Sequence, residues 1–252
     1  MTRFNVKKVA VLGAGVMGAQ IAAHLVNVKV PVVLFDLPAK EGSKSAIAEK
    51  AIANLKKLKP SPIGVAEDAD LIQPANYEEH MGLLKDCDLV IEAIAERMDW
   101  KLDLYTKIAP HVAAHALLAS NTSGLSITKL SEALPEALRH RFCGIHFFNP
   151  PRYMPLVELI ATPATEARVI DQLEAFVTSG LGKGVVRAKD TPNFIATSRA
   201  RSSGARPRAH SAPPTWWAWT PWPMSSRRCR TTWARRPTPS TAASARRPCW
   251  QS

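Results

Sequence analysis

Short apolar runs alternate with longer amphipathic stretches along residues 1–190 of the chain. The runs are rich in Val, Ile and Leu, which is typical of strands buried on both faces of a parallel sheet. The amphipathic stretches carry apolar residues three and four positions apart, as a helix with one buried face does. We therefore predict an α/β fold with a doubly wound parallel sheet and crossover helices.

The predicted strands cover residues 9–12, 30–35, 89–94, 117–119, 143–146, 157–160 and 184–186. The predicted helices cover residues 17–28, 43–58, 100–113 and 165–181. Pro60 and Pro62 end the second of these helices, because proline lacks the amide hydrogen that a helix needs.

The pattern stops near Thr197, where the composition changes. Residues 198–252, called the tail below, hold 11 Arg and six of the seven Trp, but no Lys, Asp, Glu, Leu, Ile, Val or Phe. The tail therefore contributes +11 to the net charge of +12, and residues 1–197 carry only +1. A segment without aliphatic side chains cannot bury enough apolar surface to offset its ordering entropy. We predict a folded domain over residues 1–187, a connector over residues 188–197 and a disordered basic tail.

Four cysteines lie far apart in the sequence, without the paired spacing of a metal site: Cys87, Cys143, Cys229 and Cys249. We therefore predict no bound metal and reduced thiols in a reducing compartment. No apolar run approaches the ~20 residues that cross a bilayer, and no apolar leader follows Met1. These features predict a soluble protein of the cytoplasm.

A glycine-rich turn, Gly13-Ala-Gly15-Val16-Met17-Gly18, follows the first predicted strand and opens a helix. A dinucleotide fingerprint requires this context. Gly13 permits the tight turn, Gly15 lets the backbone approach a pyrophosphate, and Gly18 lets the helix pack close to the strand. The pyrophosphate would lie at the helix N-terminus, where free N–H groups and the helix dipole favour an anion.

Asp36 ends the second predicted strand, 18 residues after Gly18. A carboxylate there can accept hydrogen bonds from a ribose 2′-hydroxyl and repels a 2′-phosphate, which favours NAD over NADP. The alternative, an accidental glycine turn in another kind of α/β protein, would leave Asp36 unexplained. Strand, turn, helix and terminal acid together predict a Rossmann-type domain that binds NAD.

Three segments dense in polar residues follow later strands: EAIAE at 92–96, SNTSG at 120–124 and HFFNPPRYMPLVE at 146–158. In an open parallel sheet, ligands bind beyond the carboxyl ends of the strands, where these side chains gather. His146 ends one predicted strand and Glu158 begins the next, so the two can meet as a base and its orienting carboxylate. Such a pair suits an imidazole that removes a hydroxyl proton near neutral pH. A histidine satisfied within the core is the alternative reading of His146 alone.

Five segments together resemble the NAD-binding domain of the 3-hydroxyacyl-CoA dehydrogenase family: VLGAGVMGAQIA, DLVIEAIAERMDWK, ASNTSGLSI, HFFNPPRYMPLVEL and DTPNFI. The resemblance covers residues 5–196, and its HFFNPP…VE and SNTS parts are specific to the family. It implies NAD-dependent oxidation of (S)-3-hydroxyacyl-CoA to 3-ketoacyl-CoA in fatty-acid β-oxidation. A β-hydroxyacid dehydrogenase shares the glycine fingerprint but lacks the HFFNPP…VE pairing.

The resemblance also implies roles for individual residues. His146 matches the general base, Glu158 its partner, and Ser123 the serine that hydrogen-bonds the substrate oxygen. The positions that match contacts to the nicotinamide half of the cofactor are Glu96, Lys101 and Asn149. Ser123 and Lys101 also have ordinary alternative interpretations. Ser123 can cap the following helix, and Lys101 can be a solvated helix residue.

The resemblance stops at Thr197, where the family has an active-site asparagine. In the family a helical C-terminal domain follows, which closes over the substrate and makes much of the dimer contact. The tail takes its place here. An alternative to an active dehydrogenase is therefore a non-catalytic NAD-binding fragment that has lost turnover. Fusions that carry a hydratase domain also occur in the family.

The codons of the tail suggest its origin, because Trp and Met each have a single codon. Read one base earlier, TWWAWTPWPM at residues 215–224 permits Asp-Val-Val-Gly-Leu-Asp-Thr-Met-Ala, which resembles a DVVGLDT segment in the C-terminal domain of bacterial family members. We therefore hypothesise that the tail is translated out of frame after a shift near Thr197. The competing hypothesis is a nucleic-acid-binding arm, in which arginines neutralise phosphates and tryptophans stack on bases.

Overall fold

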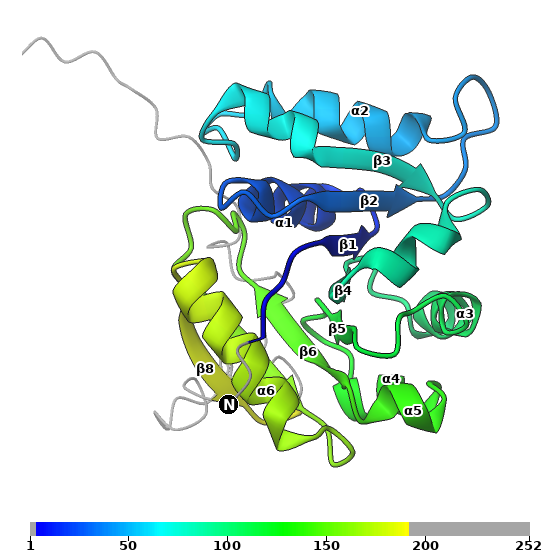
Figure 1. Ribbon diagram of the computed structural model, residues 1–252, viewed down its shortest axis with the longest axis vertical. Coiled ribbons are helices and arrows are strands. Elements are labelled where there is room, and N and C mark those ends of the chain that lie inside the picture. Colours follow the sequence, from blue (N-terminus) through cyan, green and yellow to red (C-terminus); the bar gives the residue numbers. More distant parts are fainter. Residues whose placement is uncertain (1–3, 192–252) are drawn as a thin grey trace, which may run out of the picture. The chain divides into compact units, whose positions relative to one another are not determined.

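The apolar runs form the strands of one sheet in the computed structural model, which describes residues 4–191 (Figure 1). The strands are β1 (Val9–Leu12), β2 (Val32–Asp36), β3 (Ile72–Asn76), β4 (Leu89–Glu92), β5 (Leu117–Ser120), β6 (Phe142–Phe147), β7 (Leu156–Ala161) and β8 (Gly184–Ala188). The helices are α1 (Val16–Val26), α2 (Ala46–Leu55), α3 (Met98–Ile108), α4 (Ile127–Glu132), α5 (Glu136–Arg139) and α6 (Ala167–Ala175). Shorter helical turns are η1 (Ala66–Leu71), η2 (Met81–Asp86) and η3 (Phe176–Gly180).

Within the described residues, the sheet has eight strands in the order β3-β2-β1-β4-β5-β6-β7-β8. The six strands from β3 to β6 are parallel, with β1 at the point where the chain switches direction across the sheet. This arrangement confirms the predicted doubly wound architecture. The last two strands differ from a fully parallel sheet, since β7 is antiparallel to β6 and β8 is parallel to β7. The connection over residues 148–155 is too short for the crossover that a parallel neighbour requires.

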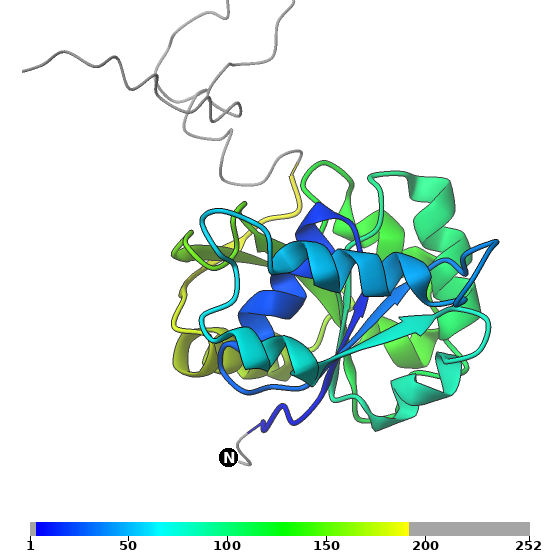
Figure 2. The same cartoon turned by 90° about the horizontal axis from the view of Figure 1, so that it is seen from above.

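The sheet is buried on both faces because successive side chains point to opposite sides. On β1, Val9 and Val11 pack with residues of α1, α2 and α6, whereas Ala10 and Leu12 pack with residues of α3, α4 and α5. Figure 2 shows these two sets of helices with the strands between them. The parallel strands therefore bring the ends of β1, β2, β4, β5 and β6 to one edge.

Sequence patterns did not predict β3, α4 and α5, nor the short helical turns η1 and η2. The β3 sequence IQPAN contains Pro74 and lacks an alternating or continuous apolar pattern. Proline is tolerated there because β3 is an edge strand that, among the described strands, pairs only with β2. The helices α4 and α5 are only six and four residues long, too short for a clear helical period.

Asp190, the third residue of the predicted connector, is held at the start of α4. The Asp190 carboxylate accepts hydrogen bonds from the Ser126 hydroxyl at 2.8 Å, the Ile127 amide at 3.0 Å and the Thr128 amide at 2.8 Å. Partial burial opposes ionisation of Asp190, but these hydrogen bonds lower its pKa below the ordinary value. The last described residues are thereby attached to the β5 side of the sheet.

No helix among residues 4–191 is both long and apolar enough to cross a membrane. The tail lies outside the described residues, so its predicted disorder stays a prediction.

His24, in the last turn of α1, is buried beside two cations. The residue is only 7% exposed, and neither ring nitrogen has a hydrogen-bond partner within the described part of the chain. Burial, aided by the charges of Lys183 and Arg152, lowers the pKa of His24 from 6.5 to about 4. The folded protein therefore keeps this imidazole neutral in mildly acidic solution.

Acid should destabilise the protein through His24. The unfolded chain binds a proton at this residue below pH 6.5, whereas the folded protein does so only near pH 4. The free energy of unfolding should be fully retained above pH 6.5 and fall by up to about 3 kcal/mol as the pH drops towards 4. Urea unfolding across this range measures the effect. His24→Leu should remove most of this fall in the free energy of unfolding between pH 6.5 and 4. His115→Leu, which removes an exposed histidine, should leave the fall unchanged. The opposite pattern would show that another group is responsible.

Candidate active site

The glycine turn between β1 and α1 has the geometry that each glycine was predicted to provide. Gly13 has a φ of +104°, and a Cβ there would lie 2.9 Å from the carbonyl oxygen of Ala93. A Cβ on Gly18 would lie 1.8 Å from the carbonyl oxygen of Gly13. A Cβ on Gly15 would meet no atom within 4 Å. Gly13 and Gly18 are thus required by the fold, whereas Gly15 leaves open space at the start of α1.

Asp36 lies at the end of β2 next to this turn. Its Oδ2 accepts a hydrogen bond from the Ala14 amide at 2.6 Å, and its Oδ1 accepts one from the Leu37 amide at 2.7 Å. The carboxylate is therefore fixed against the glycine turn. Its negative charge lies at the end of β2, where the ribose hydroxyls of a dinucleotide are expected.

A cavity of about 720 Å³ extends from the glycine turn over the ends of β2 and β4. It is lined by Gly13, Gly15, Asp36, Leu37, Pro38, Tyr77, Glu78, Met81, Ala93, Ile94, Ala95, Trp100, Asp103, Leu104 and Lys107. The lining combines aromatic and apolar side chains with the Asp36 carboxylate, as an adenosine site requires. The open space at Gly15 and this cavity together fit a bound dinucleotide.

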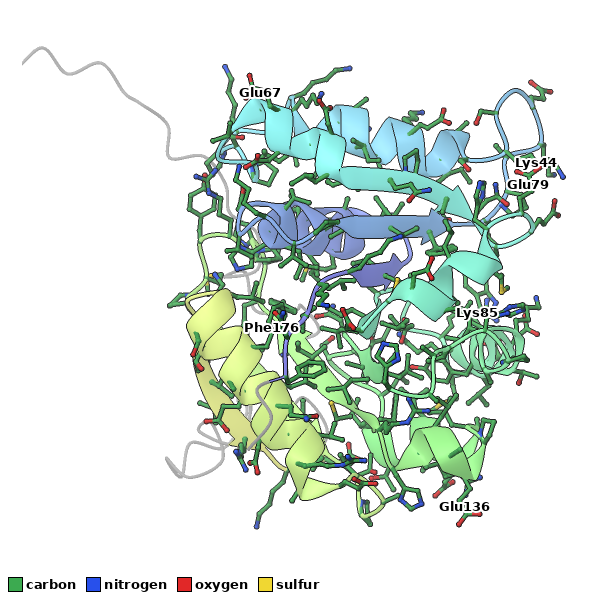
Figure 3. The ribbon with its side chains drawn as sticks, in the orientation of Figure 1. Lys44, Glu67, Glu79, Lys85, Glu136 and Phe176 are labelled. Atoms are coloured by element: carbon green, nitrogen blue, oxygen red, sulfur yellow. The ribbon has the colours of Figure 1, made fainter. Side chains whose placement is uncertain are left out.

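The two loops that flank the cavity are joined by polar contacts. Lys44, before α2, donates to Glu78 at 2.8 Å, which raises the pKa of the Lys44 amine. Figure 3 shows Lys44 next to Glu79, whose carboxylate accepts a hydrogen bond from the side-chain Nδ2 of Asn76 at 3.0 Å. The ring of Tyr77, which lines the cavity, stacks on Phe35 with centroids 5.9 Å apart.

His146 and Glu158 face each other across the antiparallel pair of β6 and β7. The His146 Nδ1 lies 2.7 Å from the Glu158 Oε2, and the Glu158 side chain is only 1% exposed. A carboxylate at Nδ1 favours the tautomer that carries its proton there and its basic lone pair on Nε2. The ring also packs against Phe148, with centroids 4.7 Å apart. The predicted pair is therefore formed, by a strand reversal rather than by two parallel strand ends.

Ser123 lies in the loop after β5, which Glu96 holds. The Glu96 Oε1 accepts hydrogen bonds from the amides of Ser123 at 3.1 Å, Gly124 at 2.7 Å and Leu125 at 3.2 Å, and from the Thr122 hydroxyl. Burial opposes ionisation of the Glu96 carboxyl, but these donors lower its pKa below the ordinary value. In this structure Glu96 positions the backbone that carries Ser123. The alternative in which Ser123 caps a helix is not what the structure has, since Ser126 accepts the capping bond from the Lys129 amide.

Lys101 is fully buried in α3 and so is not the solvated helix residue of the alternative reading. Its ammonium lies 2.5 Å from the Glu92 Oε1 at the end of β4. Asn149 lies beyond β6, and its Oδ1 accepts a hydrogen bond from Gln20 of α1 at 3.4 Å. None of His146, Ser123 and Asn149 lines the cavity beside Asp36. The site thus has one part at the ends of β1 and β2 and another at the ends of β5 and β6.

Glu92 lies in a predicted polar segment without a predicted role, and no sequence pattern pointed to Tyr77. Glu92 carried one signal, as an acid directly after the apolar residues Leu89-Val-Ile91 of a buried strand. Tyr77 follows the unpredicted strand β3, so its place beside the glycine turn was invisible in the sequence.

Comparison with protein families matches residues 8–191 to "3-hydroxyacyl-CoA dehydrogenase, NAD binding domain". A protein of Rickettsia felis, named for a trifunctional fatty acid oxidation complex, is 45% identical over 193 residues. A protein of Deinococcus radiodurans, named for 3-hydroxyacyl-CoA dehydrogenase, is 42% identical over 194 residues. The crystal structure of 3-hydroxybutyryl-CoA dehydrogenase from Escherichia coli aligns with a TM-score of 0.65 at 34% identity, covering 78% of this chain and 41% of that chain.

The matched region is only part of these relatives. Each alignment covers 76% of this chain, but 27% of the Rickettsia protein and 56% of the Deinococcus protein. The similarity therefore concerns a domain with the glycine turn, Asp36 and the His146–Glu158 pair, and the relatives contain further sequence beyond it.

Proposed function

Because this chain belongs to the 3-hydroxyacyl-CoA dehydrogenase family through the NAD-binding domain at residues 8–191, we propose that it carries the NAD-dependent oxidation site for (S)-3-hydroxyacyl-CoA. The observation that carries this proposal is the His146–Glu158 pair, with its 2.7 Å contact, on β6, three places along the sheet from β1, which precedes the glycine turn. A general base at this edge faces the same side of the sheet as the cofactor site.

The proposed reaction converts the C3 hydroxyl of the substrate into a ketone. His146 accepts the hydroxyl proton at Nε2, and the Glu158 carboxylate stabilises the imidazolium that results. The chemistry that NAD supplies when bound is acceptance of the hydride that leaves C3. Ser123 donates a hydrogen bond to the substrate oxygen. Proton and hydride together account for the two-electron oxidation, so no further oxidant is needed.

The cofactor contacts we propose follow the two parts of the site. Val16 and Met17, with Gly13, Gly15 and Gly18, present the start of α1 to the diphosphate. Asp36 accepts hydrogen bonds from the adenosine ribose. Glu96, Lys101 and Asn149 belong to the part of the site that holds the nicotinamide half, where Glu96 fixes the Ser123 loop and Asn149 adjoins α1.

Two measurements test the proposal together. Calorimetry with the full chain should show NAD binding, and acetoacetyl-CoA reduction with NADH should be weak or absent. The second expectation follows because the tail has no Leu, Ile, Val or Phe with which to form an apolar lid, so water stays in the site and an acyl-CoA gains few contacts. Absence of NAD binding would refute the proposed function. Acetoacetyl-CoA reduction as fast as that of a full-length relative would refute the expected loss of turnover.

Selectivity between NAD and NADP should depend on Asp36. The added 2′-phosphate of NADP would lie next to the fixed Asp36 carboxylate, and juxtaposed like charges cost several kcal/mol of binding free energy. We expect NADP to bind at least about a hundredfold more weakly than NAD. In parallel titrations, Asp36→Asn should reduce the difference between the NAD and NADP affinities, mainly by improving NADP binding. Equal affinity of the unchanged protein for both cofactors would show that the adenosine ribose does not lie at Asp36.

We further propose the division predicted from the sequence, with a domain over residues 1–187, a connector over residues 188–197 and a tail that is translated out of frame. The composition of the tail and the DVVGLDT-like reading support it. Sequencing the DNA that encodes residues 190–225 tests it. A single uninterrupted frame, confirmed by the mass of the protein, would refute it, and salt-dependent binding of nucleic acid to the isolated tail would favour the competing hypothesis.

A cytoplasmic location is also proposed, and it is supported by Cys87 and Cys143, which are buried free thiols. Fractionation of source cells tests this location, and recovery in a membrane or secreted fraction would contradict it.

An acyl-CoA is the proposed substrate. Dimerisation through a C-terminal domain, which the family resemblance implies, stays a prediction.

A further inference from the structure

We propose that Lys183 is a positioning residue for the nicotinamide half of the cofactor site, because its ammonium holds the loop that carries Asn149. The loop consists of residues 148–155, between β6 and β7, and is called the reversal loop below. This inference rests on the proposed NAD-binding function. It gives a role to a buried lysine to which the family resemblance assigns none.

The reversal loop begins and ends at the proposed reaction site. It follows Phe147, the last residue of β6, and leads into β7, where Glu158 lies opposite His146. Asn149 is its second residue and accepts a hydrogen bond from Gln20 of α1 at 3.4 Å. Strand pairing fixes His146 opposite Glu158, but no strand contains Asn149. The place of Asn149 therefore depends on the path of the loop.

Apolar burial does little to fix the second half of the reversal loop. Tyr153 is 48% exposed and Met154 is 37% exposed, and none of residues 152–155 is buried. A segment with few buried apolar contacts opens at little cost in free energy unless hydrogen bonds hold it. Polar contacts must therefore determine the path of this half of the loop.

Lys183 and its neighbour supply three of these polar contacts. The Lys183 Nζ donates to the carbonyl oxygen of Met154 at 2.8 Å and to that of Arg152 at 3.2 Å. The Gly184 amide donates to the carbonyl oxygen of Pro155 at 2.8 Å. The backbone of the reversal loop is thus attached to the start of β8.

The ammonium of Lys183 is held where it is by a fixed turn. Gly182 has a φ of +67°, and the Lys183 amide donates to the Val177 carbonyl at 3.1 Å. The residue is only 7% exposed, and none of the ion pairs within residues 4–191 includes it. Burial lowers the pKa of the Lys183 amine, because it opposes the charged form.

A buried ammonium costs free energy that an apolar side chain of similar length, such as methionine, would not cost. The two carbonyl oxygens offset part of the cost for Lys183. Methionine could fill the same space but could not donate to these carbonyls. The specific contribution of Lys183 is therefore the attachment of the reversal loop.

A second anchor holds the same loop through its side chains. The Arg152 Nη1 donates to the Ser61 carbonyl at 2.8 Å, and the Tyr153 hydroxyl donates to it at 2.7 Å. The Arg152 guanidinium also lies over the Tyr153 ring, 5.4 Å from its centroid. Because both anchors fix the same residues, loosening either one should disturb Asn149 and weaken the same ligand.

The test compares two ligands on the full chain, NADH and ADP-ribose, which lacks the nicotinamide ring. Calorimetric titrations are made well below the melting midpoint of each variant. Lys183→Met should weaken NADH about tenfold, as expected for the loss of one or two hydrogen bonds to the nicotinamide half. ADP-ribose should stay within about twofold of wild type, because its proposed contacts lie at Asp36 and the glycine turn. Lys85→Met, the same change at an exposed lysine of η2, is the matched control and should alter neither affinity.

A milder variant keeps the inference testable if Lys183→Met fails to fold. Tyr153→Phe removes only the hydroxyl that donates to the Ser61 carbonyl, and the bond from Arg152 remains. It should weaken NADH by about threefold and leave ADP-ribose unchanged.

Four results would overturn the inference. Equal weakening of both ligands, or a lower melting temperature with unchanged affinities, would mean that Lys183 supports the fold without positioning Asn149. Weaker NADH binding in Lys183→Met but not in Tyr153→Phe would mean that Lys183 contacts the cofactor directly. Wild type that binds NADH no more tightly than ADP-ribose would mean that the nicotinamide half is not held. The proposed function itself fails separately, if wild type binds neither ligand.

Discussion

Gly15→Ala is expected to leave the free protein as stable as wild type while weakening NAD binding by at least about a hundredfold, or about 3 kcal/mol. The residue has a φ of −69° and a ψ of −171°, which alanine adopts without strain. Its new methyl group would meet no protein atom within 4 Å, so the fold has room for it. The same space is where the diphosphate must approach the start of α1, so the methyl group excludes the ligand alone.

Gly18→Ala is the matched control, because the same chemical change falls on a position that the fold fills. A Cβ there would lie 1.8 Å from the Gly13 carbonyl oxygen, so the helix or the turn must shift. We expect a loss of roughly 3 kcal/mol or more in the free energy of unfolding, together with weaker NAD binding. Urea unfolding and calorimetry on both variants separate the two effects. If Gly15→Ala bound NAD normally, the diphosphate would lie elsewhere.

His146→Gln is expected to slow acetoacetyl-CoA reduction by about a thousandfold, the range of general acid–base catalysis. Glutamine can still donate to Glu158, but it has no basic nitrogen to exchange a proton with the substrate. NAD affinity should change little, because the proposed diphosphate and adenosine contacts lie at the glycine turn and Asp36, whose cavity His146 does not line. A single-turnover measurement with excess protein and NADH suits this chain, whose steady-state turnover is expected to be slow.

His140→Gln provides the control for this experiment. His140 is exposed, and its Nδ1 lies 3.2 Å from the Ala164 carbonyl oxygen, away from Glu158. The rate in this variant should equal that of wild type. Equal rates in His146→Gln and wild type would remove His146 from the proposed mechanism and leave the His146–Glu158 pair a structural contact.

The sequence was most informative where burial and chemistry coincided in a local pattern. The runs that became β1, β2, β4, β5 and β6 are buried on both faces, so almost every residue had to be apolar. The glycine turn was equally predictable, because Gly13 and Gly18 are required by backbone conformation and close packing. Helix ends were less well predicted: residues 43–58 were expected to be helical, whereas α2 spans Ala46–Leu55.

The remaining features depend on contacts that no local pattern contains. Glu158 was expected at the start of a strand, but its position opposite His146 follows from the reversal between β6 and β7. Edge strand β3 could be missed because it tolerates Pro74, and Tyr77 was missed with it. The Glu92 carboxylate accepts four hydrogen bonds, from the Ile94 amide and from side chains of α3 and β5, and these become visible only in the folded chain.

The most direct test of the account is a nuclear Overhauser measurement on the full chain with NAD bound, with the His146 ring as the reporter. If the glycine turn holds the diphosphate and the His146–Glu158 pair faces the reacting end, the imidazole protons of His146 will show cross-peaks to the nicotinamide protons. Cross-peaks from the nicotinamide to other side chains, with none to His146, would contradict the account.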